Sequence, residues 1–110
     1  MKIVKTLPPM HPGEMLREEF LEPLGLTPYA VAKACGVPRT RIERIAREEI
    51  GISADTALRL AKLLGTSAEF WLNLQTRCDV LTAERAIAKD LQTDIAKDLK
   101  RIEPLKRQAA

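Results

Sequence analysis

The sequence predicts an all-α fold: a five-helix domain followed by an additional C-terminal amphipathic helix. Apolar residues recur at intervals of three and four along most of the chain, and no segment alternates apolar and polar residues over any length. Ser, Thr, Pro and Gly stand where helices begin and end. A chain of 110 residues has room for one such domain and a helical appendage.

The boundaries of the five helices follow from their capping residues. A Ser or Thr N-cap or a proline in the first turn opens each helix, and a glycine closes several of them. The expected segments are Pro12 to the stop signals Pro23 and Gly25, Thr27 to Gly36, Pro38 to Arg47, Ser53 to Gly65, and Ser67 to about Val80. The fourth is expected to bury Ala57, Leu58, Leu60, Ala61 and Leu64.

The chain is expected to divide into a flexible N-terminal arm over residues 1–10, a helical domain over 11–81 and a C-terminal extension over 82–110 with a frayed end. The extension carries a narrow apolar stripe that predicts one amphipathic helix, too thin to fold alone. This stripe could cover its own domain, a second subunit or another protein, and a second subunit is slightly favoured. Its members are Ile87, Leu91, Ile95, Leu99 and Ile102.

Composition argues against several classes of protein. Hydrophobic residues make up 45% and charged residues 30%, as in a globular domain rather than a disordered one. The longest apolar run is far shorter than the roughly 18 residues of a membrane span. Residues 1–6 lack the apolar stretch of a signal peptide. We therefore expect a cytoplasmic protein.

The residue types that carry catalysis are scarce. His11 is the only histidine, so neither a histidine metal site nor a base–nucleophile relay is expected. Cys35 and Cys78 match no metal or redox spacing and are interpreted as reduced core thiols, with a disulfide as the alternative. There is no glycine-rich phosphate loop. The chain is expected to be no enzyme and to need no cofactor or metal.

Basic charge is concentrated in one segment. The net charge of the chain is only +3. Residues 11–26 hold four glutamates and one arginine, a net of −3, whereas residues 27–47 hold one lysine and four arginines against one glutamate, a net of +4. Such asymmetry indicates a surface for nucleic acid.

The same basic segment has the packing pattern of a helix-turn-helix between Thr27 and Arg47. Two short helices that cross steeply need a small residue at the crossing and an unhindered turn, and Ala32 and Gly36 meet these needs. On a helical wheel the apolar residues of the second helix fall opposite its arginines. The expected inward residues are Val31, Cys35, Val37, Ile42 and Ile45.

The outward residues are the candidates for DNA contact. An α-helix fits the major groove, where Arg can bond guanine through two atoms and Glu can accept from cytosine. The expected base contacts are Arg39, Thr40, Glu43 and Arg44, and the expected phosphate contacts are Thr27, Tyr29, Lys33, Arg41 and Arg47. The alternative is a merely solvated stripe with an internal Glu43–Arg47 pair. Glu48 and Glu49, next to this surface, would weaken indiscriminate binding.

A dimer spanning two half-sites is expected, because a monomer of charge +3 would bind DNA weakly. The expected subunit contacts are Phe70, Trp71, Leu74 and Leu81. Phe70 and Trp71 sit among leucines, which favours a core and dimer role over a base-stacking platform.

Several motifs together resemble the HigA antitoxin family, within the Cro and lambda-repressor-like group of helix-turn-helix regulators. The resemblance covers roughly residues 9 to 81. The motifs that carry it are Pro9-Met10-His11-Pro12-Gly13-Glu14, Leu21-Glu22-Pro23-Leu24, Gly36-Val37-Pro38-Arg39, Gly51-Ile52-Ser53-Ala54-Asp55-Thr56-Ala57-Leu58-Arg59-Leu60-Ala61 and Ser67-Ala68-Glu69-Phe70-Trp71-Leu72-Asn73-Leu74-Gln75.

The resemblance implies a homodimeric repressor that binds the operator of its own operon and pairs with a HigB-type toxin, a ribosome-dependent mRNA endonuclease. Relatives usually carry Asn-Gly in the turn after the recognition helix, where this chain has Arg47-Glu48-Glu49-Ile50. They also often end soon after the fifth helix. An orphan regulator without a toxin, and a protein-interaction module that has lost its DNA contacts, are the alternatives.

Overall fold

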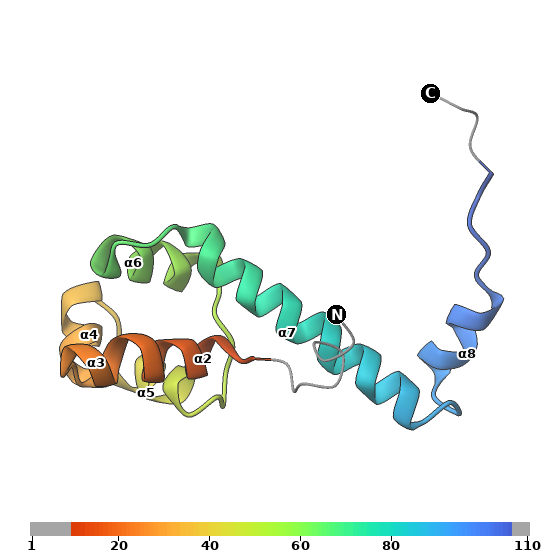
Figure 1. Ribbon diagram of the computed structural model, residues 1–110, viewed down its shortest axis with the longest axis horizontal. Helices are drawn as coiled ribbons and strands as arrows, with labels where there is room; N and C mark the ends of the chain where they lie inside the picture. The colour runs from red at the N-terminus through yellow and green to blue at the C-terminus, as the bar shows by residue number, and fades with distance from the viewer. Residues whose placement is uncertain (1–9, 107–110) are drawn as a thin grey trace. The chain divides into compact units, whose positions relative to one another are not determined.

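The computed structural model describes residues 10–106, which form helices and no strands (Figure 1). The chain divides between Asp79 and Val80 into two compact units. The elements, in order, are α2 (Pro12–Met15), the π-helical η1 (Leu16–Leu21), α3 (Glu22–Leu24), α4 (Pro28–Cys35), α5 (Arg39–Ala46), α6 (Ala54–Leu64), α7 (Ala68–Lys89) and α8 (Asp94–Arg101). The predicted arm over residues 1–10 and the predicted frayed end lie largely outside the described residues.

The first predicted helix is a continuous run of α2, η1 and α3, and it does not stop at Pro23. Proline lacks an N–H, and in a regular α-helix its ring clashes with the carbonyl four residues earlier. Here the residues before it form a wide π turn, in which the Glu22 N–H bonds to the carbonyl of Arg17. The helix ends instead at Gly25, whose φ is 63°. Of the two predicted stop signals, Gly25 is therefore confirmed and Pro23 is not.

The core of the first unit is built around Trp71. Its ring is fully buried, lies 5.4 Å from that of Phe20 and 5.1 Å from that of Phe70, and its indole N–H donates to Thr66 Oγ1 over 2.8 Å. A side chain this enclosed within its own unit has no surface to offer a second subunit. The predicted core role of Trp71 is confirmed, and its predicted contact with a partner subunit stays a prediction for which this unit offers no exposed Trp71 surface.

The predicted N-caps are confirmed at three helices. The hydroxyl oxygens of Thr27, Ser53 and Ser67 accept hydrogen bonds from backbone N–H groups in the first turns of α4, α6 and α7. One core prediction fails in α6, because Leu58 is 64% exposed. At about 100° per residue it lies well away from the buried stripe centred on Ala57 and Leu60.

The C-terminal region differs most from expectation. Helix α7 runs on to Lys89 instead of ending near Val80. The predicted single amphipathic helix is interrupted after Lys89, because the Asp90 carboxylate accepts from the Gln92 N–H and Thr93 caps a separate helix, α8. The large apolar residues of this region, Leu91, Ile95, Leu99 and Ile102, are each about half exposed or more.

A close backbone approach joins α2 to α5. Gly13 is buried against Ile45, and a Cβ atom added at Gly13 would lie 1.8 Å from the Ile45 carbonyl oxygen. The Gly13 N–H is also bonded, since it donates to His11 Nδ1 over 2.9 Å. Only a residue without a side chain fits at this contact.

We predict that Gly13→Ala destabilises the domain by about 3 kcal/mol, because the methyl group displaces backbone rather than a flexible side chain. Urea unfolding followed by circular dichroism measures the change. Lys62→Ala, at an exposed position of α6, is the control and should stay within about 0.5 kcal/mol of wild type. Equal unfolding midpoints for Gly13→Ala and the control would contradict the proposed contact.

Candidate nucleic-acid interface

Helices α4 and α5 pack as the predicted helix-turn-helix. Ala32 is buried at their crossing, and the Val37 N–H donates to its carbonyl oxygen over 3.0 Å. The turn passes through Gly36, whose φ of 72° lies in the left-handed region that favours glycine. Ile42 and Ile45 of α5 are fully buried. This packing fixes which face of α5 is turned outward.

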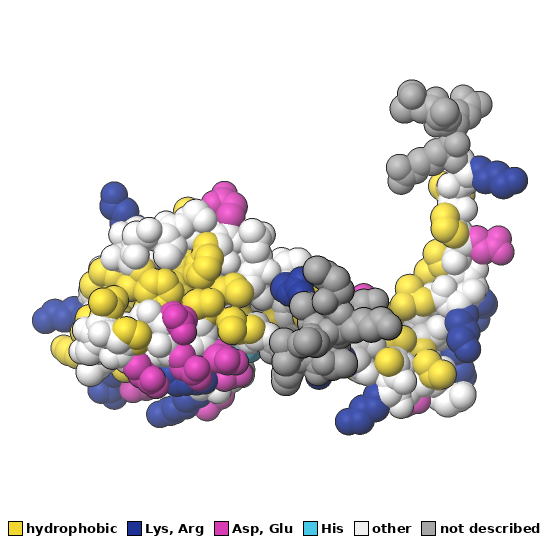
Figure 2. All heavy atoms as spheres, in the orientation of Figure 1, with side chains coloured by type: hydrophobic (Ala, Val, Ile, Leu, Met, Phe, Trp, Pro, Cys, Tyr) yellow, Lys and Arg dark blue, Asp and Glu magenta, His cyan; other side chains and the backbone are white. Residues whose placement is uncertain are grey.

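The outward face of α5 carries the residues predicted to read bases. The side chains of Arg39 and Arg44 are 61% and 54% exposed, Thr40 is exposed, and Glu43 is partly exposed. Figure 2 shows basic and acidic side chains mixed along the lower edge of the first unit, where Figure 1 draws α2 and α3 in front of α5, and Glu43 lies among the arginines of α5 itself. The surface is therefore not uniformly positive.

Ion pairs engage both of these arginines. Arg39 Nε lies 3.4 Å from Glu43 Oε2, and Arg44 Nε lies 3.5 Å from Glu49 Oε1. Glu43 thus pairs with Arg39 rather than with Arg47, which is exposed and has no ion pair within residues 10–106. Nε is the guanidinium atom nearest the carboxylate in both pairs, and the terminal nitrogens of Arg39 and Arg44 make no hydrogen bond within residues 10–106.

Arg41, a predicted phosphate contact, is already bound within the domain. Its guanidinium lies 3.0 Å from Asp55 Oδ2, and the same oxygen accepts from Arg59 Nε over 3.1 Å. Arg59 also donates to the carbonyl oxygen of Cys35, at the end of α4, over 2.7 Å. Asp55 and Arg59 therefore link α4, α5 and α6. Sequence reasoning missed both, although their i,i+4 spacing in α6 is a usable signal.

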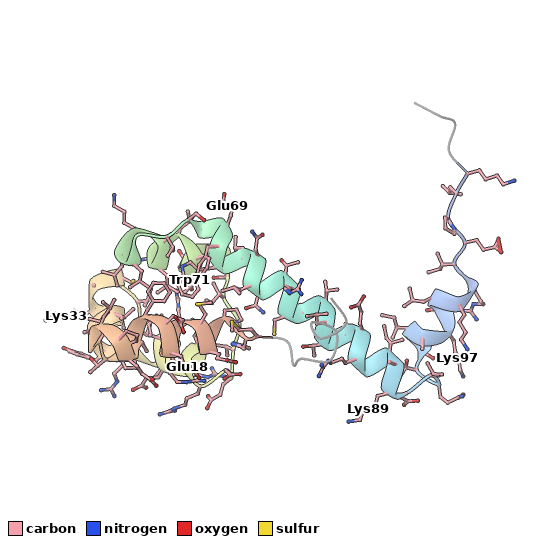
Figure 3. The ribbon with its side chains drawn as sticks, in the orientation of Figure 1. Glu18, Lys33, Glu69, Trp71, Lys89 and Lys97 are labelled. Atoms are coloured by element: carbon pink, nitrogen blue, oxygen red, sulfur yellow. The ribbon has the colours of Figure 1, made fainter. Side chains whose placement is uncertain are left out.

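The other predicted phosphate contacts lie on or just before α4. Tyr29 is 55% exposed and Lys33 is exposed at the outer edge of the unit (Figure 3). Thr27 is exposed, but its hydroxyl oxygen already accepts from the Ala30 N–H as the helix cap. Their roles on DNA stay predictions.

The turn after α5 has an unusual backbone. Glu48 has a φ of 63°, a conformation that costs a residue with a side chain about 1–2 kcal/mol. Arg17, which sequence reasoning did not single out, holds this turn: it contacts Glu48 Oε2 at 3.2 and 3.3 Å and donates to the Ala46 carbonyl oxygen over 2.6 Å. These contacts connect η1 to the end of α5.

The cysteines and acidic residues show no catalytic arrangement in the described part of the chain. Cys35 and Cys78 are both buried and free. Burial raises the pKa of the Cys35 thiol, against the opposing charge of Arg59, so it stays protonated near neutral pH. No group of three possible metal ligands occurs among residues 10–106, and no helix there is long and apolar enough to cross a membrane.

Comparison with known proteins identifies the family. A family model described as helix-turn-helix matches residues 17–71, half of the chain. The chain belongs to the helix-turn-helix family. This family is a class of DNA-binding proteins and not of enzymes. The motif that its members share is the α4–α5 pair described above, which lies within the matched residues.

Relatives of this helix-turn-helix protein include antitoxins. It is 53% identical over 79 residues to virulence-associated protein I of Dichelobacter nodosus, covering 72% of this chain and 73% of that one. It is 43% identical over 72 residues to antitoxin HigA-1 of Vibrio cholerae, and the match covers 66% of this chain and 68% of HigA-1. The predicted resemblance to the HigA antitoxins is confirmed.

Solved structures of similar proteins contain operator or promoter DNA. Pseudomonas aeruginosa antitoxin HigA with the higBA promoter is 43% identical, with a TM-score of 0.75 over 89% of this chain and 99% of that one. Antitoxin GraA in complex with its operator is 42% identical, with a TM-score of 0.78, and the match covers 92% of this chain and 95% of GraA. Such coverage reaches beyond Leu81. The expectation that relatives end soon after the fifth helix is therefore wrong for these two.

We predict that Asp55→Asn lowers stability near neutral pH and that its effect shrinks in acid. Arg59 and then Arg41 lower the pKa of Asp55 in the folded chain. A lowered carboxyl pKa contributes stability above the unfolded value of about 3.9, and this contribution is lost as the pH falls through the folded value.

Urea unfolding of both proteins, at neutral pH and below the unfolded pKa of Asp, measures this difference. Glu69→Gln, at an exposed position of α7 without an ion pair among the described residues, is the matched control. A pH-independent difference between Asp55→Asn and wild type would contradict the link between Asp55 and the two arginines.

Proposed function

We propose that the protein is the antitoxin of a type II toxin–antitoxin module. It binds operator DNA as a homodimer through α4 and α5, represses its own operon and neutralises a HigB-type mRNA endonuclease toxin in the cytoplasm. The observation that carries the DNA-binding part is the outward row of arginines on α5, held by a fully buried Ile42 and Ile45. The likeness to antitoxins bound to operator or promoter DNA supports it.

In this proposal α5 enters the major groove and its outward residues read the bases. The terminal nitrogens of Arg39 and Arg44 can each bond O6 and N7 of one guanine, which discriminates by roughly 1–3 kcal/mol per good pair. Thr40 and Glu43 lie on the same face, and Glu43 can accept from a cytosine amino group. Arg39 and Thr40 stand at the start of α5, which usually contacts base edges, and Glu43 and Arg44 follow one turn later on the same face.

Phosphate contacts would position α5 without selecting a sequence. Thr27, Tyr29 and Lys33 offer donors from α4, and Arg41 and Arg47 offer them from α5 and its end. Of the proposed dimer contacts, Phe70, Leu74 and Leu81 keep partly exposed side chains. A dimer would present two α5 helices to half-sites about one turn of DNA apart.

We predict that Arg39→Ala and Arg44→Ala relax sequence choice, each costing about 1–3 kcal/mol on the preferred duplex. Lys33→Ala should weaken binding to all sequences about equally, because a phosphate contact carries no base information. A duplex selected by the wild-type protein from a randomised pool, and its single-base variants, would be titrated by fluorescence anisotropy. Unchanged base preference in both arginine variants would contradict the assignment.

The toxin part of the proposal rests on the relatives named as antitoxins. An orphan regulator of the same fold is the alternative. The two differ in what the adjacent gene encodes and in what co-purifies with the protein.

We predict that the adjacent reading frame encodes a small basic toxin, that its expression alone arrests growth, and that co-expression of this chain restores growth. Tagged antitoxin should retain the toxin through purification. Arg39→Ala with Arg44→Ala, which acts only on DNA reading, should still restore growth. Operator binding without any growth rescue or co-purification would favour the orphan regulator.

A further inference from the structure

We propose that Glu49 sets the specificity of DNA binding by competing with DNA phosphates for Arg44. The inference rests on the proposed function, because it concerns how the α5 surface distinguishes its operator from other DNA. It assigns a role to the acidic turn, Glu48 and Glu49, that follows α5.

The turn that carries Glu49 is held in a defined conformation. The Glu48 N–H donates to the carbonyl of Ile45 over 2.9 Å and the Glu49 N–H to that of Arg44 over 2.8 Å, the two bonds of a Schellman motif. Arg17 holds the Glu48 carboxylate at 3.2 and 3.3 Å. The backbone of Glu49 is therefore tied to the end of α5, and its carboxylate faces Arg44 at 3.5 Å.

The pair acts on one part of the Arg44 guanidinium. Nε is the Arg44 atom nearest Glu49, and the terminal nitrogens of Arg44 make no hydrogen bond to any of the described residues. These two nitrogens can bond O6 and N7 of guanine together. Glu49 thus offsets the charge of Arg44 and leaves its base-reading atoms available.

This offset affects the two kinds of DNA complex differently. Binding to a random duplex depends almost entirely on phosphate contacts and counterion release. On such DNA, Arg44 would exchange the Glu49 carboxylate for a phosphate, and this exchange would contribute little binding free energy. On the operator, Arg44 can bond guanine while Glu49 stays on Nε. The negative end of the α5 dipole, together with Glu48 and Glu49, adds repulsion toward phosphates at the same place.

The test compares Glu49→Gln with wild type on two probes: a duplex of random sequence, and a duplex that the wild-type protein selects from a randomised pool. Dissociation constants would be measured by fluorescence anisotropy from about 50 to 200 mM salt. Glu69→Gln removes the same charge from the opposite edge of the unit (Figure 3) and is the matched control. Circular dichroism melting checks that both variants stay folded.

We expect Glu49→Gln to bind the random duplex at least about fivefold more tightly than wild type at roughly 0.1 M salt. The slope of the logarithm of the binding constant against the logarithm of the salt concentration should be steeper by about one per protomer. Affinity for the selected duplex should change less, so the specificity ratio falls. Glu69→Gln should match wild type on both probes. Equal constants and slopes for Glu49→Gln and Glu69→Gln on the random duplex would overturn the inference.

A failure of the proposed function gives a different result. In that case the wild-type protein enriches no sequence from the pool, whereas the random-duplex titrations still report the competition for Arg44. If wild type selects a duplex but Glu49→Gln keeps the wild-type specificity ratio, the inference alone is wrong.

Discussion

The packing of α5 against its neighbours is the constraint on which the rest of the structure depends. The helix is short, and two of its residues, Ile42 and Ile45, are completely buried. Gly13 brings α2 against the Ile45 carbonyl so closely that no side chain fits between them, and the small residue Ala32 of α4 is buried. Because interiors are close-packed, these contacts fix the rotation of α5 about its axis. That rotation decides which side chains face outward.

Much of this arrangement could be predicted from the sequence, because its causes are local. The caps at Thr27, Ser53 and Ser67 each depend on one hydroxyl and a nearby N–H. The turn at Gly36 depends on one residue that tolerates a positive φ. Periodicity placed Ile42 and Ile45 inside and Arg39 and Arg44 outside, because helical geometry relates residues only a few positions apart.

The remainder depends on contacts between distant residues, which no local pattern encodes. The passage of the first helix through Pro23 needs a π turn, and a proline in a sequence normally indicates the end of a helix. The ring of Trp71 packs against that of Phe20, which belongs to an element far earlier in the chain. The contact of Arg17 with Glu48 joins side chains 31 residues apart. Such pairs become visible only when the helices are in place.

Carboxylates lie beside the arginines of α5, so the local charge of this surface is lower than its arginines alone would give. Arg39, Arg41 and Arg44 each face a carboxylate, from Glu43, Asp55 and Glu49 respectively. Exposed pairs of this kind add little stability, typically below about 1 kcal/mol, so their effect on folding is small. In the proposed DNA complex their effect on binding is larger, because each pair reduces the sequence-independent attraction to phosphate. A surface of this kind would owe a larger share of its affinity for DNA to base contacts than a surface of unpaired arginines would. Selectivity then follows from the geometry of individual guanidinium groups rather than from total charge.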